Sequence, residues 1–466
     1  MADGLVSRRR CDLDIKSGAL RDELQRWRAA SAAGQALAKH HSQVGRVAAR
    51  LEGLVERIQS VDIGDAELLD RGRSQEQKLL TAHVIWDFFR SKFAQRLDTS
   101  FTGHLGVCDD FAWECYSPVQ LMFHRRPGNA DRVSATREPP LVFLNGGWSP
   151  LAIGRSSAFQ IERTTGGWAS HEEFSEVIEN LPVPLLGLPW FHVAHLPDAL
   201  VIAHEVGHIV EWDFQLRPDL NNALAATVAR ERLEAWRAWL PEVFADVYGC
   251  LAGGGAFVAT LLDFLVQGPA RLAADRRNAG AWGAYPPAWL RTRLLVETLR
   301  ALAASDRGRE TVELLAARQL LYFGEPAANL DFAGDPAVVV AAILDCACST
   351  LETSAGTTPR VRDLLPTGGP DARAVATNII RNNAPGSSEL PVLLAAARWV
   401  WEADPEAWVE RDFDARIRAL LPPPPPGVRG PLRHEMVRGG AEEEEVEDRE
   451  KQRGADWFDA LFADPP

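Results

Sequence analysis

Residues 200–210 read LVIAHEVGHIV, a run in which two histidines and a glutamate lie among apolar side chains. His204 and His208 are four residues apart, so a helix would project both imidazoles from one face, where both can bind one metal ion. Glu205 follows the first histidine, and its carboxylate can reach a water on that metal without being a ligand. Unpaired histidines are costly in an apolar core, so the pattern favours a metal-binding helix over a surface helix.

The flanking residues indicate where this helix begins and why it contains a glycine. Pro197 and Asp198 form a start signal, with Asp198 able to cap the first backbone N–H groups, and the helix is expected to end near Phe214. Gly207 costs a helix about 1 kcal/mol relative to alanine. Its expected use is the close approach of another element to this face.

A later helix is expected to supply the remaining polar groups of the site. It covers about Arg230 to Leu251, and Pro241 marks either a kink or the first turn of a new helix. Glu242 and Asp246 are four residues apart on a common face of this apolar stretch. Carboxylates in such surroundings need partners, although a reading as helix-surface charges stays open.

A catalytic zinc site typically takes three protein ligands and a water. Glu242 is therefore expected to be the third ligand, 34 residues after His208. Asp246 is expected to accept from the distal nitrogen of His204, which would orient that ring. Glu211 is an alternative ligand, although three ligands from one helix face would crowd the metal.

The two segments together resemble the glutamate-zincin metallopeptidases, whose pattern is HExxH followed on a later helix by a glutamate in an ExxxD arrangement. The resemblance covers about 50 of the 466 residues. It implies zinc bound by His204, His208 and Glu242, with Glu205 as the base and Asp246 behind the ligands. The metzincin subgroup is excluded, because Glu211 and Phe214 stand where it has a glycine and a third histidine. Aspartate-type zincins would make Asp246 the ligand, but their spacing to a downstream Tyr-Gly is one residue longer than in DVYG here.

A reaction follows from these parts. Zinc lowers the pKa of its water from about 15.7 toward roughly 7, Glu205 takes the proton, and the hydroxide attacks a carbonyl that the zinc polarises. Glu205 would then pass the proton to the leaving amine. A donor for the developing oxyanion is also expected. The candidates are Tyr285 and Arg291 in YPPAWLR, then Tyr248, His192 and His195.

Composition limits the partners and the compartment. Hydrophobic residues make up 46% and charged residues 24%, as in soluble globular proteins. The net charge of −14 argues against nucleic acid as the main partner. The six cysteines are scattered without metal or redox spacing, which favours a reducing compartment. The amino terminus does not read as a secretory signal, and no run of about 20 apolar residues stands out, so we expect a cytoplasmic protein without a membrane segment.

The amino-terminal third of the chain reads as helical. Residues 17–60 carry one apolar stripe at alternating spacings of three and four: Val44, Val47, Leu51, Leu54 and Ile58. This favours a helical hairpin that packs on the body, with a dimerising or partner-docking coiled coil as the alternative. A second helix is expected from Ser74 to about Leu97. From about residue 101 to 200, Gly, Pro and aromatic residues interrupt short apolar runs, and 141–144 and 183–188 read as strands.

The carboxyl-terminal part is expected to hold a helical lobe and a tail. A break is expected at GGGAF, residues 253–257, and helices at about 290–304, 310–322, 338–348 and 393–401. Five prolines at 422–426 are expected to end ordered structure. Beyond them, AEEEEVEDRE reads as a solvated acidic run, and DWFDALF could form one short apolar helical face. The tail reads either as a disordered solubility tail or as a tethered segment that occupies the cleft or recruits a partner.

The fold class that these patterns predict is α+β and predominantly helical, with a zincin-like catalytic domain that has a small mixed sheet and an active-site helix. The expected divisions are an N-terminal helical region at 1–100, the zincin-like domain at 101–300, a C-terminal helical lobe at 301–421 and a disordered tail at 422–466.

The favoured function is a zinc metallopeptidase, with Zn²⁺ as cofactor and a protein or peptide as substrate. An extended substrate could pair with an exposed strand such as 141–144. The alternative is a zinc-containing regulatory or scaffold protein that binds a partner through its N-terminal helices or its tail. A zinc hydrolase acting on a non-peptide amide has the same sequence signature, because the motif defines the reaction type better than the substrate.

Overall fold

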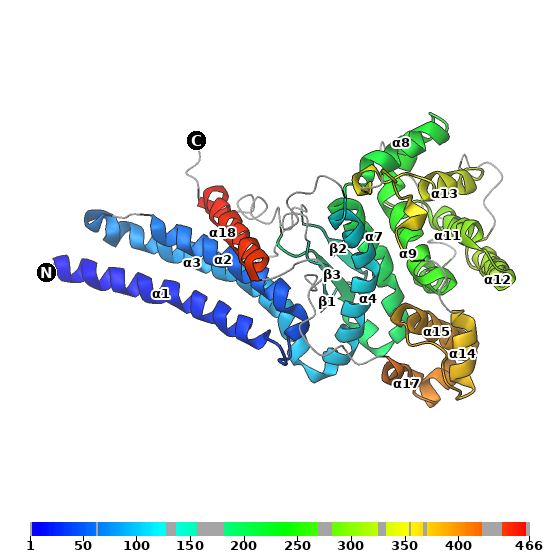
Figure 1. The fold of residues 1–466 in the computed structure, drawn as a ribbon, viewed down its shortest axis with the longest axis horizontal. Helices are drawn as coiled ribbons and strands as arrows, with labels where there is room; N and C mark the ends of the chain where they lie inside the picture. Colours follow the sequence, from blue (N-terminus) through cyan, green and yellow to red (C-terminus); the bar gives the residue numbers. More distant parts are fainter. Residues whose placement is uncertain are drawn as a thin grey trace.

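The computed structural model describes residues 2–61, 64–126, 137–155, 181–268, 282–324, 332–353, 356–366, 371–421 and 440–462. These residues form a mostly helical fold with one small mixed sheet, which confirms the predicted class at that level. An extended helical arm lies on one side, a larger helical body on the other, and the sheet between them (Figure 1).

The arm contains α1 (Ala2–Ala30), α2 (His41–Ser60) and α3 (Asp65–Ala94). The apolar stripe predicted on α2 is buried inside the arm, against side chains of α1, α3 and the last helix of the chain. Helix α3 begins at Asp65 rather than at Ser74, and a short 3-10 turn (Gln95–Leu97) follows it. The apolar stripe therefore packs against other helices of the same chain.

A long helix, α4 (Thr99–His124), occupies a region that the sequence patterns describe as interrupted short runs. That expectation is wrong. Asp98 caps the first turn through its side chain, and the helix continues through Pro118. Phe111 and Tyr116 on its inner face are fully buried in the body core, and such packing outweighs local helix propensity.

The sheet has three short strands in the order β1-β3-β2. β1 (Leu141–Asn145) and β3 (Leu185–Pro189) are parallel, and β2 (Leu151–Ile153) is antiparallel to β3. The strands predicted at 141–144 and 183–188 are confirmed, the second with a start at residue 185. Strand β2 was not predicted, because three residues are too few to show an alternating pattern.

The outer edge of β1 is already occupied by side chains. Gln95 donates to the Leu144 carbonyl and accepts from the Leu144 N–H, both at 2.8 Å. Arg96 donates to the Val142 carbonyl. Strand 141–144 therefore does not offer an exposed edge to an extended substrate, and that expectation is wrong.

Two helices at the centre of the body carry the HEVGH motif and the later acidic pair. A 3-10 segment (Leu196–Val201) leads into α7 (Ile202–Asp213), and α8 (Arg217–Thr227) connects it to α9 (Leu233–Leu265). The carboxylate of Asp198 does not cap α7 but lies 2.9 Å from Nδ1 of His195. The predicted helix thus begins a few residues later, at Ile202.

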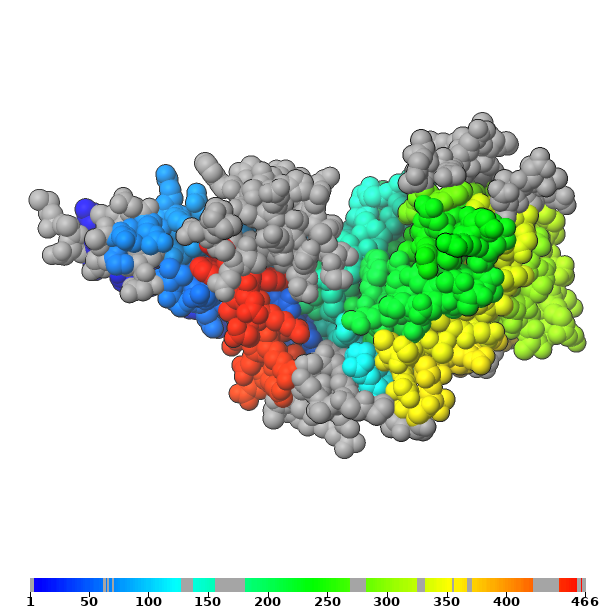
Figure 2. Space-filling model, turned by 90° about the horizontal axis from the view of Figure 1, so that it is seen from above, coloured from blue at the N-terminus to red at the C-terminus, as the bar shows by residue number. Residues whose placement is uncertain are grey.

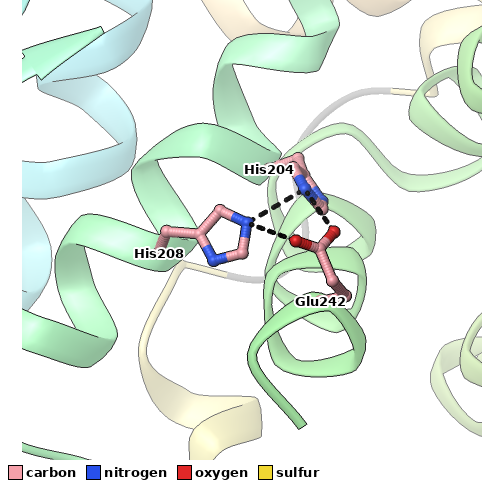
Figure 3. Close-up of side chains that lie close together, drawn as sticks. All are labelled: His204, His208 and Glu242. Carbon is pink, nitrogen blue, oxygen red and sulfur yellow. Dashed lines mark hydrogen bonds and ion pairs between the residues drawn. The ribbon is translucent and has the colours of Figure 1, made fainter. Parts of the chain in front are cut away.

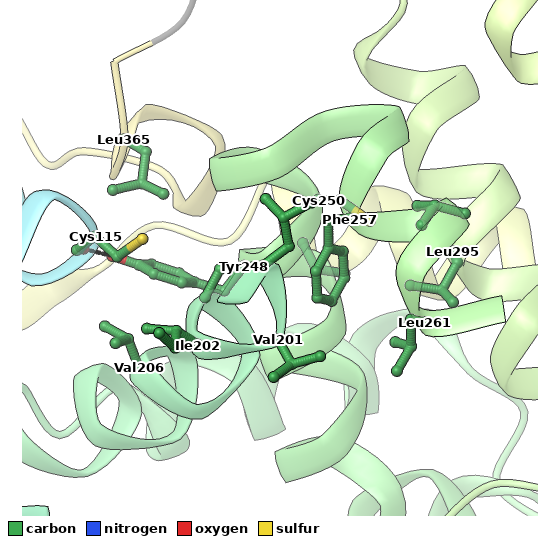
Figure 4. Close-up of a cluster of buried hydrophobic side chains, with 14 of the residues drawn as sticks. Cys115, Val201, Ile202, Val206, Tyr248, Cys250, Phe257, Leu261, Leu295 and Leu365 are labelled. Atoms are coloured by element: carbon green, nitrogen blue, oxygen red, sulfur yellow. Dashed lines mark hydrogen bonds between the residues drawn. The ribbon is translucent and has the colours of Figure 1, made fainter. Parts of the chain in front are cut away.

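At Gly207, the glycine of α7, the backbone of α9 comes close to that of α7. A Cβ there would lie 2.9 Å from the Ala245 Cα and 3.0 Å from the Tyr248 Cβ. Only hydrogen fits in this space, so the expected close approach of another element is confirmed. Around it, Ile202, Val206 and Tyr248 form part of the buried apolar cluster (Figure 4).

Helix α9 passes through Pro241 without a break and bends at Gly254, whose φ is 53°. The predicted break at residues 253–257 is confirmed. By length and composition α9 is apolar enough to cross a membrane, although no run of about 20 apolar residues stands out in the sequence. In the structure 67% of its most apolar stretch is buried. Its apolar character is explained by its central place in the core of the body.

The C-terminal lobe consists of short helices, several of which pack against α9 while others pack on one another. They are α11 (Ala288–Leu302), α12 (Asp306–Phe323), α13 (Pro336–Leu344), α14 (Ala372–Ile380), α15 (Leu390–Ala403), α16 (Pro405–Glu410) and α17 (Phe413–Leu420). The helices expected at 290–304, 310–322, 338–348 and 393–401 correspond to α11, α12, α13 and α15. One apolar core runs through α4, α7, α9 and this lobe, and a second lies in the arm. The domain limits stay predictions.

The last element, α18 (Gly440–Phe462), corrects the expectation of a disordered tail over these residues. It lies along α2 of the arm, apart from the C-terminal lobe (Figures 1 and 2). Trp457 and Phe458 are buried in the arm core, so the apolar face expected for DWFDALF exists and is in use. The acidic run is ordered because it pairs with arginines of the arm, among them Arg50 with Glu450. The proline run at 422–426 lies outside the described residues.

Candidate metal centre

Three buried side chains from α7 and α9 converge on one point (Figure 3). Nε2 of His204 lies 3.2 Å from Nε2 of His208 and 3.4 Å from Oε2 of Glu242. Nε2 of His208 lies 3.5 Å from Oε1 of Glu242. This group could hold a metal ion, and it matches the pattern that the sequence predicted for these residues.

The spacing of the three donors fits a single tetrahedral ion. Bonds of about 2.0–2.1 Å at tetrahedral angles place neighbouring donor atoms roughly 3.3 Å apart. The two histidine nitrogens, 3.2 Å apart, lie close to that value, and each of them lies 3.4 or 3.5 Å from a different oxygen of Glu242. Two imidazole nitrogens that face each other can share only one proton, and Oε2 of Glu242 has no aligned hydrogen bond among the described residues. A cation between these atoms would satisfy all three.

Asp246 and Arg291 stand behind the three donors. Oδ1 of Asp246 lies 2.9 Å from Nδ1 of His204, on the far side of the ring from Glu242. Arg291 of α11 donates from Nε and Nη2 to Asp246 at 2.7 and 2.9 Å, and its Nη2 lies 3.2 Å from Oε2 of Glu242. Arg291 is buried, so its charge is held between the two carboxylates. This bidentate arrangement fixes both carboxylates in position.

The two histidines differ in protonation in the metal-free chain. Burial alone would lower the pKa of His204, but its contacts with Asp246 and Glu242 raise it to about 9. Burial and the neighbouring His204 cation lower the pKa of His208 to about 3. At neutral pH the chain therefore holds one imidazolium and one neutral imidazole side by side, with His208 ready to coordinate.

Metal binding is expected to release a proton from His204. Since the pKa of His204 is about 9, the ring is protonated below that pH and must lose the Nε2 proton before it can coordinate. We expect His204 to contribute about one proton per metal bound at pH 7 and none well above pH 9, in addition to the proton lost by a metal-bound water, and metal affinity to rise with pH over that window. Calorimetry in buffers of different ionisation enthalpy measures the number. Release that does not change between pH 7 and pH 10 would contradict this assignment.

Glu205 lies on α7 beside the first ligand and is buried. Burial, the largest influence, raises its pKa to about 7 against the opposing effect of the His204 cation. A carboxyl group with that pKa can take up and give back a proton near neutral pH, which is the property of a general base. The structure thus gives Glu205 suitable chemistry at the predicted position.

Two aromatic residues flank the three donors. Tyr285 is 60% exposed, and the Arg291 guanidinium lies 5.5 Å from its ring centre. The nearby Glu242 charge raises the pKa of the Tyr285 hydroxyl, so it remains a proton donor. On the other side, Trp212 stacks on His208 with ring centres 5.7 Å apart. Sequence reasoning missed Trp212, although its position four residues after His208 places it on the same helix face.

Four other candidates make their contacts elsewhere. Tyr248 donates its hydroxyl to the Cys115 carbonyl at 2.6 Å. His195 packs on Trp401 and pairs with Asp198, and His192 is buried beside Phe191. Glu211, the alternative ligand, is engaged by Arg217 at 2.7 Å. The structure brings none of these four into the group of donors that could hold the metal.

Comparisons with protein-family models, with curated proteins and with solved structures gave no match.

Proposed function

We propose that the chain is a zinc-dependent metallopeptidase with a zincin-like catalytic domain. The observation that carries this proposal is the buried donor set of His204, His208 and Glu242, with the carboxyl of Glu205 beside it. Two neutral nitrogens and one carboxylate are a donor set typical of catalytic zinc, which keeps a further position for water or substrate. Bound there, zinc would polarise the substrate carbonyl and acidify a water.

The residues of the chain have distinct roles in this proposal. Glu205 accepts the proton of the attacking water and delivers it to the leaving amine, for which a pKa near neutrality suits it. Asp246 holds the ring of His204 in one orientation through Nδ1. Arg291 is already engaged by Asp246 and Glu242, so its contribution is to hold these carboxylates. Tyr285, which is exposed next to them, is the better candidate for the oxyanion donor.

Substrate docking is proposed at β2. The edge of β1 is closed by Gln95 and Arg96, whereas β2 is the opposite edge of the described sheet and packs against α7. Trp212, which stacks on His208, also lies against Gly154 at the end of β2. This places the sheet edge beside the metal centre, where an extended peptide could add as a strand.

The scaffold alternative has less support. Its partner would bind through the N-terminal helices or the tail, but the apolar side chains of the tail, Trp457 and Phe458, are buried against those helices. A cytoplasmic location remains our proposal. The six cysteines are free, and all but Cys11 are buried, as expected for a reducing compartment.

Cleavage of unfolded protein is the direct test. We expect the purified chain, loaded with one equivalent of zinc, to generate new amino termini in a panel of denatured proteins. Chelation should stop the reaction and added zinc should restore it, because the attack requires the metal. New termini are counted by mass spectrometry after amine labelling. Stoichiometric zinc without cleavage across the panel would contradict the peptidase proposal and favour a binding role or a non-peptide substrate.

A further inference from the structure

The docking of α18 on α2 combines charge complementarity with very close packing. The α18 face is acidic and aromatic, and the α2 face presents arginines. Nε of Arg50 donates to Oε2 of Glu450 at 2.8 Å, with both side chains 2% exposed, and the Arg50 guanidinium lies 4.9 Å from the Trp457 ring centre. Near the end of α1, Arg28 also pairs with Glu447. The α2 surface therefore fits an acidic amphipathic helix.

Two glycines let the helix backbones touch. A Cβ on Gly53 of α2 would overlap the Lys451 backbone, and a Cβ on Gly454 of α18 would overlap the Arg50 carbonyl. No side chain can be placed at either position without separating the helices. The contact is thus specific to this pair of surfaces, and α2 is the main partner of α18 among the described helices.

A path of buried charges continues from α18 into the body. Oε1 of Glu450 lies 3.7 Å from Nη1 of Arg46, whose Nε lies 2.8 Å from Oε1 of Glu138. Glu138 is fully buried, and its backbone carbonyl accepts from Arg155. Each of these charged groups is largely buried, so its charge is stabilised by its oppositely charged neighbours rather than by water.

The path ends on the metal helix. Nε of Arg155 donates to Oδ2 of Asp213 at 3.3 Å, and Asp213 is the last residue of α7. The same carboxylate oxygen accepts from the Tyr116 hydroxyl of α4 at 2.6 Å. The end of α7 therefore contacts Arg155, which itself donates to the Glu138 carbonyl, and His208 lies five residues before that end.

We propose that α18 is a clamp that sets the position of the carboxyl end of α7 and thereby the affinity of the metal centre. The surface that receives it on α2 is a docking site for an acidic amphipathic helix, and its occupant is α18 of the same chain. Undocking removes Glu450 from Arg46 and Arg50, while Arg46 keeps its ion pair with Glu138, and Glu138 and Arg155 then rearrange around the changed charges. The inference rests on the proposed metal centre but not on peptidase activity.

The test compares three variants of the full chain. Glu450→Gln removes the carboxylate charge through which α18 pairs with Arg46 and Arg50. Gly454→Ala forces the helices apart without changing any charge. Glu445→Gln is the matched control, because Glu445 is half-exposed and pairs with Arg449 on its own helix. Zinc affinity is measured by competition with a chromophoric chelator, and amide hydrogen exchange is followed in α2 and in the last turn of α7.

We expect Glu450→Gln and Gly454→Ala each to weaken zinc binding by about fivefold to tenfold, a typical size for coupling between distant sites. Both should speed exchange in α2 and at the end of α7, and Glu445→Gln should change neither. Faster exchange in α2 with unchanged zinc affinity and unchanged α7 exchange would overturn the proposal. If the unaltered chain binds no zinc, the proposed metal centre is wrong. Amide hydrogen exchange at the end of α7 then still decides whether α18 fixes that helix end.

Discussion

Replacement of Glu205 with glutamine is expected to abolish hydrolysis while zinc stays bound. Glutamine keeps the shape of the side chain but cannot accept the proton of the attacking water, and loss of a general base typically costs about 10²- to 10⁴-fold in rate. The three metal donors are on other residues, so the zinc content should remain one per chain. Turnover of a labelled peptide and metal analysis of the same sample give the two quantities.

The control for this variant lies on the same helix. Glu211 is also buried but engaged by Arg217, and it is not one of the grouped donors. Glu211→Gln should therefore keep most of the activity, although it weakens an ion pair. If Glu205→Gln retained the full rate, Glu205 would not be the base and the reaction proposed for the site would be wrong.

Replacement of His204 with alanine is expected to remove the metal. His204 touches both other donors, and Asp246 behind it would lose its imidazole partner. Since loss of a partner behind a ligand already costs 10- to 100-fold in affinity, loss of the ligand itself should cost more than about 100-fold. Zinc measured by plasma emission after dialysis should fall from one per chain to near zero.

His195→Ala is the matched control for the ligand variant, because His195 pairs with Asp198 and packs on Trp401 away from the grouped donors. That variant should keep its zinc. A His204→Ala chain that still carried one zinc after dialysis would place the metal elsewhere in the protein. Far-ultraviolet circular dichroism of both variants separates a lost ligand from a lost fold.

The metal centre could be predicted from sequence because its signals are local. His204 and His208 are one turn apart on a helix, and Glu242 and Asp246 repeat the same spacing on the next long helix. Gly207 indicated that another element packs closely against this helix, and in the structure that element is α9. The distances between the donor atoms of α7 and α9 depend on this close packing. Sequence periodicity alone does not predict them.

The features that were missed depend on partners far away in the chain. Helix α4 contains glycines and Pro118, and its helical state is stabilised by burial rather than by propensity. From the sequence alone the acidic run of α18 reads as solvated, because Arg50, the partner of Glu450, lies 400 residues earlier in the chain. The pairing of Arg291 with Asp246 likewise joins α11 to α9 across 45 residues, and no short pattern marks it.

The remote pairing of Arg50 with Glu450 also has a consequence for the order in which the molecule assembles during synthesis. The donors of the metal centre lie within residues 204–242, so they can meet as soon as α9 has been made. The arm is the opposite case. Its first three helices leave the ribosome early, yet the carboxylate that neutralises Arg50 is translated 400 residues later. The amino-terminal helices of a nascent chain therefore lack this partner until α18 has been made, and a chain cut short before α18 would expose them.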